Sequence, residues 1–132
     1  TKILAVTVLT SLGSKDVEEL GYSDRYVNNI TELVMLKARM AKEAGCSGVV
    51  CSGLEVENVK AELGKDFIVV TPGIRPAWSL VGKDDQKRII TPYQALKKGA
   101  DYIVVGRPIR TAEKPIEAAK RVLDEIEMAI SG

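Results

Sequence analysis

Four short apolar runs, each followed by a segment with helical spacing, restrict the fold of this chain more than any other feature. Apolar runs that stop at polar or glycine-containing loops are typical of buried strands. The predicted strands cover residues 3–9, 48–51, 67–70 and 102–105. Four strands in strict alternation with four main helices predict an α/β fold of parallel βα units with right-handed crossovers.

Helix boundaries follow from local sequence chemistry. Helical spacing predicts one long helix from about residue 25 to 44. The sequence Ser-Gly-Leu-Glu at 52–55 fits a capping box, and Thr91, Pro92 and Gln94 fit a second one with proline at the first helical position. The last predicted helix begins at Pro115 and has an apolar side made of Ile116, Ala119, Leu123, Ile126 and Ile130.

The number of repeating units allows two architectures. At 132 residues the chain is expected to form a single domain, 1–132, with a real core. Four βα units are half of a TIM (β/α)8 barrel, whose usual length is about 250 residues. An open four-stranded sheet with helices on both faces, as in flavodoxin-like proteins, is the alternative.

Composition excludes several classes of function. The net charge of +1 gives no reason to expect nucleic acid or a membrane as a partner. The chain has no histidine and only two cysteines, Cys46 and Cys51, which excludes a zinc site and a Ser-His or Cys-His nucleophile pair. Residues 1–6 are too short and too soon polar for a signal peptide, so a cytoplasmic protein is predicted.

Two predicted strands end in a glycine–arginine loop. Residues 102–105 run into Gly106 and Arg107, and residues 67–70 lead to Gly73 and Arg75. Glycine lets a backbone approach a ligand closely, and the arginine fork fits a phosphate. One such loop alone is more often a tight turn with a solvated arginine. Two on consecutive units are where many (β/α)8 barrels hold a substrate phosphate.

The segments around these loops carry a family resemblance. Val-Thr-Pro-Gly-Ile-Arg at 70–75 is followed by Asp-Asp-Gln at 84–86, by Arg88 and by Thr-Pro at 91–92. In this order the motifs resemble orotidine 5'-phosphate decarboxylase of the bacterial type. The resemblance covers essentially the whole chain and implies the C-terminal half of the barrel. The other matching segments are 4–11, 48–52 and 99–109.

The resemblance implies substrate-binding roles for five residues of this sequence. Gly106 and Arg107 would bind the substrate phosphate, and the Gln86 amide would bridge phosphate and base. Arg75 matches a further ligand-binding position. Thr10 matches a hydroxyl-bearing position that contacts the pyrimidine, although a threonine there also fits a helix cap.

Residues 73–88 form a polar segment long enough to act as a lid. Gln86 within it also fits a solvated loop residue, and Arg75 could pair with the aspartates at 84–85. Trp78 is either a lid anchor or a packed loop residue, and we favour the packed residue.

The family's catalytic Asp-x-Lys-x-x-Asp motif is not found in the sequence. The nearest candidate, residues 85–90, ends in isoleucine. The resemblance therefore implies a carboxy-lyase segment of de novo pyrimidine synthesis, which makes UMP and CO2 from orotidine 5'-phosphate without cofactor or metal. This chain would hold the phosphate and part of the pyrimidine site, would contain no catalytic residue and would be inactive alone.

Two other functions remain open at this point. One is a non-catalytic half-barrel module that binds a phosphate or nucleotide and assembles into an oligomer. The other is a related phosphate-sugar enzyme of the same barrel superfamily, which the residues at 84–86 and 106–107 disfavour.

Half of a barrel would leave two unpaired strand edges, at residues 3–9 and 102–105. We therefore predict a homodimer. In one geometry each chain contributes four facing strands, and in the other the two chains meet across the active-site face, as in the family. Thr1 stands where an initiator methionine would, which suggests that a segment has been removed.

Overall fold

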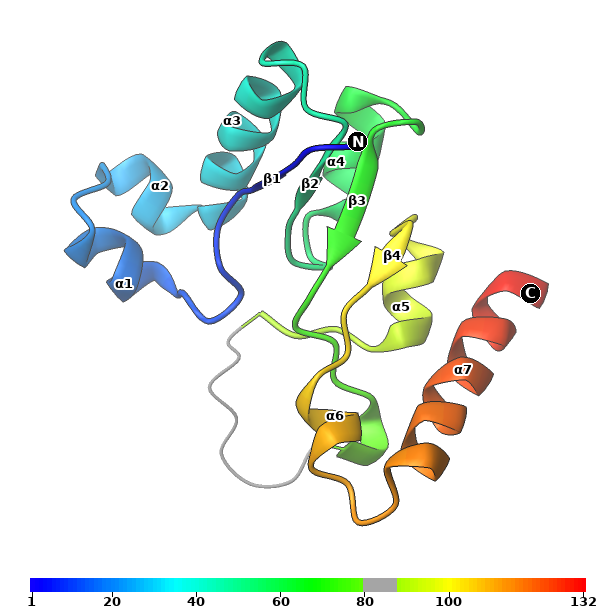
Figure 1. Cartoon of the computed structure of the whole chain (residues 1–132). Coiled ribbons are helices and arrows are strands. Elements are labelled where there is room, and N and C mark those ends of the chain that lie inside the picture. The colour runs from blue at the N-terminus through cyan, green and yellow to red at the C-terminus, as the bar shows by residue number, and fades with distance from the viewer. Residues whose placement is uncertain (80–87) are drawn as a thin grey trace.

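The computed structural model describes residues 1–79 and 88–132, and within them four parallel strands form a single sheet (Figure 1). The N-terminal elements are β1 (Leu4–Val6), α1 (Ser14–Glu19), α2 (Asp24–Asn28), α3 (Ile30–Glu43), β2 (Gly48–Val50) and α4 (Val56–Leu63). The C-terminal elements are β3 (Ile68–Thr71), the 3-10 helix η1 (Ala77–Ser79), α5 (Pro92–Lys97), β4 (Tyr102–Ile103), α6 (Arg107–Arg110) and α7 (Pro115–Ser131).

The strand order distinguishes the two architectures that the sequence allows. The order is β1-β2-β3-β4, and each strand pairs in parallel with its neighbour in sequence. Because the order never reverses, right-handed crossovers place α3, α4 and α5 on one face of the sheet, behind the strands in Figure 1. The α/β half-barrel is confirmed, and the flavodoxin-like alternative is wrong.

The register divides the strand residues between the two faces of the sheet. Val6, Val50, Val70 and Tyr102 are aligned across the four strands, so their side chains point to the same face. At the two edges of this row, Val6 is 58% exposed and Tyr102 is 62% exposed. The alternate positions face the helices and include the fully buried Val49 and Val69. Within the described residues, the face that would line a barrel is therefore apolar and partly open.

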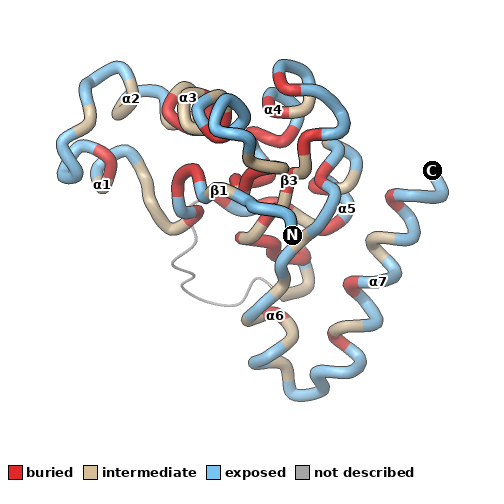
Figure 2. The backbone as a smooth tube through the Cα atoms, turned by 45° about the horizontal axis from the view of Figure 1, so that its top comes forward, coloured by how far each residue is buried: buried red, intermediate tan, exposed pale blue. Residues whose placement is uncertain are grey.

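The core lies between the other face of the sheet and α3, α4 and α5, where buried segments gather in Figure 2. On the opposite face, which includes Val50 and Val70, β2 and β3 approach closely, because a Cβ on Gly48 would lie 2.1 Å from the Ile68 carbonyl oxygen. Glycine is therefore required at this position. The core side chains that α3 and α4 contribute are Leu33, Val34, Met35, Ala38, Ala41, Val56, Val59 and Leu63.

An ion pair closes the amino-terminal edge of the sheet. Lys60 Nζ of α4 donates to Asp101 Oδ2 at 2.6 Å and to the Phe67 carbonyl oxygen at 2.9 Å. Asp101 Oδ2 also accepts a hydrogen bond from the Val69 backbone N–H at 2.7 Å. These contacts tie α4, β3 and the start of β4 together at the edge opposite the glycine–arginine loops. Residues at this edge of a (β/α) unit serve stability, whereas residues at the carboxyl edge serve function.

Three helix predictions needed correction. The single helix predicted for residues 25–44 is two helices, because Asn29 leaves the helical conformation (φ −144°, ψ 87°) between α2 and α3. The capping box predicted at 52–55 is wrong, since the helix begins after Glu55, whose carboxylate bonds to Arg88 instead. The third correction is that short helices α1 and α6, which the sequence pattern did not predict, follow β1 and β4. The second capping box, between Thr91 and Gln94, is confirmed.

The side of α7 that is buried differs from the apolar side that the sequence predicts. The helix packs against α5 and buries Ala118, Val122 and Ala129. Ile116 and Ile130, which the sequence places on the apolar side, are 74% and 73% exposed. Among the described residues, no helix has the length and apolar character needed to cross a membrane.

Candidate functional site

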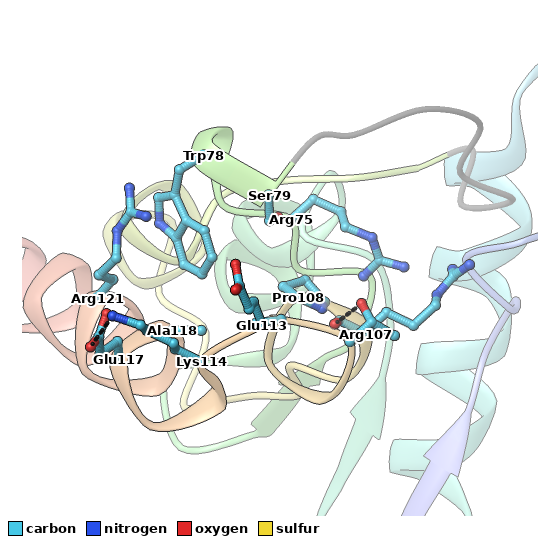
Figure 3. A pocket seen from close by; sticks show the side chains of 12 residues that line it. Arg75, Trp78, Ser79, Arg107, Pro108, Glu113, Lys114, Glu117, Ala118 and Arg121 are labelled. Carbon is cyan, nitrogen blue, oxygen red and sulfur yellow. Dashed lines mark hydrogen bonds and ion pairs between the residues drawn. The ribbon is translucent and has the colours of Figure 1, made fainter.

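The segments that follow β3 and β4 line a pocket of about 650 Å³ together with α7 (Figure 3). Arg75 lines the pocket from the loop after β3, and Arg107 lines it from the start of α6, in the loop region after β4. Figure 3 shows the two arginine side chains extending toward the same side of the site. The other lining residues come from η1, from α6 and the loop after it, and from α7, and include Trp78, Ser79, Thr111, Lys114, Glu117 and Arg121.

Gly106 keeps the space in front of α6 open. A Cβ at this position would meet no atom within 4 Å. Packing within the described chain therefore does not require glycine here. The absence of a side chain instead leaves room for a ligand to approach the backbone next to Arg107, as the sequence analysis expects.

Both the side chain and the backbone of Arg75 are hydrogen-bonded near the end of β3. Its side chain is largely buried, and its guanidinium Nη1 donates to the Ile74 carbonyl oxygen at 2.9 Å. Its backbone N–H donates to the Ile90 carbonyl oxygen at 2.9 Å, next to a parallel bridge between Ile74 and Ile90. The backbone of Arg75 is thus fixed by residues that lie 15 positions further along the chain.

Thr10 lies against the loop that carries Arg75. A Cβ on Gly73 would stand 3.2 Å from Thr10 Cβ and 3.2 Å from the Arg88 carbonyl oxygen. With a φ of +73°, Gly73 is required both for its conformation and for this close contact. Thr10 is buried and does not cap α1, which begins after Gly13. The helix-cap alternative for Thr10 is therefore wrong.

Gln86 and the aspartates at 84–85 lie outside the described residues. The roles predicted for them, including an ion pair with Arg75, stay predictions. Trp78 lies inside the described part and is packed against α7. Its ring stacks under the Arg121 guanidinium at 4.3 Å, and its Nε1–H donates to Glu125 Oε1 at 3.1 Å.

An ion pair that sequence reasoning missed lies beneath this edge of the sheet. Arg88 Nη1 donates to Glu55 Oε1 at 2.5 Å, and the two side chains are 7% and 1% exposed. Burial raises the pKa of the Glu55 carboxyl, although Arg88 opposes that rise. Within the described residues, Glu55 Oε2 and Arg88 Nε and Nη2 have no hydrogen-bond partner. One signal was available in the sequence. Arg88 stands directly before two isoleucines, and such an apolar neighbourhood is compatible with a buried arginine.

Cys51 lies near the same ion pair. Burial raises the pKa of its thiol to about 12, and the negative charge of Glu55 adds to the rise. The thiol is therefore neutral and shielded at neutral pH, which agrees with the prediction that Cys51 is a small buried hydrophobe.

Comparison with known proteins places the chain in a family. The family model described as Orotidine 5'-phosphate decarboxylase / HUMPS family matches residues 1–122. The chain belongs to this family.

The curated relatives in the orotidine 5'-phosphate decarboxylase / HUMPS family show what fraction of their length this chain covers. The Orotidine 5'-phosphate decarboxylase of Desulfosudis oleivorans is 53% identical over 97% of this chain and 51% of that protein. The protein of the same name from Syntrophus aciditrophicus is 50% identical over 98% of this chain and 49% of that protein. The chain thus spans about half the length of the curated relatives that it matches.

A solved member of the family supports the same fold. The crystal structure of Orotidine 5'-phosphate decarboxylase from Lactobacillus acidophilus superposes with a TM-score of 0.73 at 39% identity. The match covers 95% of this chain and 49% of that one. In the present chain, two of the residues predicted to bind substrate, Arg75 and Arg107, line one pocket. Gly106 adjoins Arg107, and Thr10 lies close to Gly73 in the loop that carries Arg75.

Proposed function

We propose that this chain is the phosphate-binding half of an orotidine 5'-phosphate decarboxylase, an enzyme that converts orotidine 5'-phosphate to UMP and CO2 in pyrimidine synthesis. One observation carries the proposal: two arginines from consecutive strand ends, Arg75 and Arg107, line the same pocket. Their side chains extend to the same side of the site (Figure 3), and two guanidinium groups that face one ligand suit a doubly charged phosphate. The names of the relatives supply the class of reaction.

Each predicted binding residue has a distinct role in this proposal. The Arg107 guanidinium and the open backbone at Gly106 hold the phosphate, and Arg75 adds a second positive charge. Thr10 supplies a hydroxyl for the pyrimidine, at the contact between its loop and Gly73. Gln86 bridges the phosphate and the base.

Phosphate binding contributes to decarboxylation from a distance. The phosphate is remote from the carboxylate that leaves, so binding energy at Arg107 serves to hold the pyrimidine where the reaction occurs. The sequence contains no Asp-x-Lys-x-x-Asp motif to donate the proton that replaces CO2. A complementary half has to supply that group, and neither a cofactor nor a metal takes part in the proposed reaction.

The open face of the sheet favours a second candidate, a non-catalytic module that binds a phosphate or nucleotide and assembles into an oligomer. Val6 and Tyr102 stand exposed at either edge of the row that would line a barrel. In both candidates a second protein surface covers that row, and we propose a homodimer as the simplest arrangement for the isolated chain. A cytoplasmic location stays a prediction.

An activity assay separates the two candidates. The chain alone should not convert orotidine 5'-phosphate above the uncatalysed rate, measured as the loss of substrate absorbance. Addition of the N-terminal half of a relative, such as the Desulfosudis oleivorans protein, should restore turnover if this chain is an enzyme half. Folded mixed particles without turnover would support the binding module instead.

A further inference from the structure

The buried ion pair between Glu55 and Arg88 connects two loops at the edge of the sheet that carries the site. Glu55 immediately precedes α4, and Arg88 begins the segment that pairs with the chain after β3. Burying two charges costs nearly as much desolvation energy as their attraction returns, so stability alone is a weak reason for such a pair. Its position suggests a role in the geometry of the site.

The backbone of Arg88 is bonded to the loop between β2 and α4 and lies close to Gly73. Its carbonyl oxygen accepts a hydrogen bond from Ser52 Oγ at 3.3 Å and lies 3.2 Å from the position of a Cβ on Gly73. The side chain of Arg88 is held by Glu55, so backbone and side chain are both attached to the loop between β2 and α4. Residues 88–90 are therefore fixed relative to β2.

Arg75 is attached to the same segment. Its backbone N–H donates to the Ile90 carbonyl oxygen, and its guanidinium donates to the carbonyl oxygen of Ile74, which forms the bridge with Ile90. A displacement of residues 88–90 would move the backbone of Arg75 and the anchor of its guanidinium together. Glu55 and Arg75 are thus linked by two hydrogen bonds, to Arg88 and to Ile90, and by the short stretch of chain between these two residues.

We propose that Glu55 and Arg88 are positioning residues: their ion pair fixes residues 88–90 and thereby aims the Arg75 guanidinium at the phosphate of the ligand. This role rests on the proposed phosphate-binding function. Glu55 and Arg88 act through Arg75, because both are buried and neither is among the described residues that line the pocket.

The test uses Glu55→Gln in the full chain, which keeps the shape of the side chain and an oxygen acceptor but removes the charge. We expect the affinity for UMP to fall about tenfold while the affinity for uridine, which lacks the phosphate, is unchanged. Glu62→Gln is the matched control, since Glu62 lies on α4, the helix that Glu55 precedes, in an exposed pair with Arg39. That variant should bind both ligands like the wild type.

Amide hydrogen exchange gives a second readout that general destabilisation would not reproduce. Exchange at the Arg75 amide should accelerate in Glu55→Gln, because its acceptor Ile90 is loosened. The Val69 amide, which is bonded to Asp101 at the other edge of the sheet, should keep its wild-type rate. If Glu55→Gln does not fold, Arg88→Lys retains both charges without the arginine fork and should show the same selective changes.

Other results of these experiments would contradict either the positioning role or the proposed function. Equal losses for UMP and uridine, or equal acceleration at Arg75 and Val69, would mean general destabilisation and would overturn the positioning role. A folded variant with wild-type affinity for UMP would overturn it as well. If the wild-type chain binds UMP no better than uridine, the proposed function fails, and the positioning role fails with it.

Discussion

Arg107 is the residue from which the proposed phosphate site can be tested most directly. It lines the pocket from the first position of α6, next to the open backbone of Gly106. Loss of a hydrogen bond to a charged group costs about 1.5–3 kcal/mol, so Arg107→Ala should weaken UMP binding by about that amount. Calorimetry should show that uridine binding hardly changes.

The same short helix supplies the control for this variant. Arg110 ends α6, is exposed and is not among the described residues that line the pocket. Arg110→Ala should leave UMP binding close to the wild-type value. Equal losses for UMP and uridine in Arg107→Ala would refute a phosphate role for Arg107.

Cys51 makes stability depend on pH in the alkaline range. The folded state keeps the thiol protonated up to a pKa of about 12, whereas the unfolded chain ionises near the ordinary value of 9.0. The unfolded state therefore binds fewer protons between these values, and the free energy of unfolding falls as pH rises from 9 to 12. The full effect of this group is up to about 4 kcal/mol.

Urea unfolding at several pH values measures this effect. Cys51→Ala should lose that part of the alkaline decline, and Cys46→Ala, which keeps Cys51, controls for the removal of one thiol. A Cys51→Ala variant whose stability falls as steeply as that of the wild type would show that the thiol is not responsible.

At the scale of the elements, the contact of Lys60 with Asp101 joins α4, β3 and β4 far from the pocket. Asp101→Ala removes the acceptor for the Val69 N–H and leaves Lys60 without its carboxylate, so it should destabilise the fold by about 1–3 kcal/mol in urea unfolding. Asp101→Asn keeps an oxygen acceptor and should cost less. UMP binding, measured below the unfolding transition, should be unaffected in both variants, and a selective loss of UMP binding would contradict the separation of the two edges.

Two capping-box patterns show what the sequence could and could not predict at this scale. Residues 52–55 and 91–94 have equivalent local chemistry, yet only the second forms the reciprocal bonds. Glu55 has a partner 33 positions away in Arg88, and this tertiary contact replaces the local one. A window of a few residues contains no information about such a distant partner. The local pattern therefore predicted a capping box at 52–55 that does not form.

The helices illustrate the same limit in another way. Periodicity predicted the helix at α7 but not the side that it buries, because none of the five residues assigned to the apolar side is fully buried. Ala118 and Val122 pack inward, while Ile116 stays exposed. The strands were easier to predict, because buried parallel strands appear as continuous apolar runs whatever covers them. The glycine–arginine loops could also be predicted from the sequence, since each combines a strand end with a glycine and an arginine.

For the whole molecule, the exposed row across the sheet predicts association. Val6 and Tyr102 lie on the two edge strands, whose outer hydrogen-bonding groups have no strand partner within the described residues. Unpaired apolar edges favour pairing with another chain. Light scattering at micromolar concentration should therefore give at least twice the chain mass of 14.3 kDa. A well-folded particle of 14.3 kDa would contradict this expectation.

The sequential strand order also affects how such a chain can evolve. Because every strand lies beside its neighbour in sequence, no connection crosses the outer edge of β1 or β4. Further βα units can be added at either edge by gene duplication or fusion, without any existing connection being rethreaded. The chain thus has the topology of a transferable building block, whose binding loops stay together when it is recombined with a new partner.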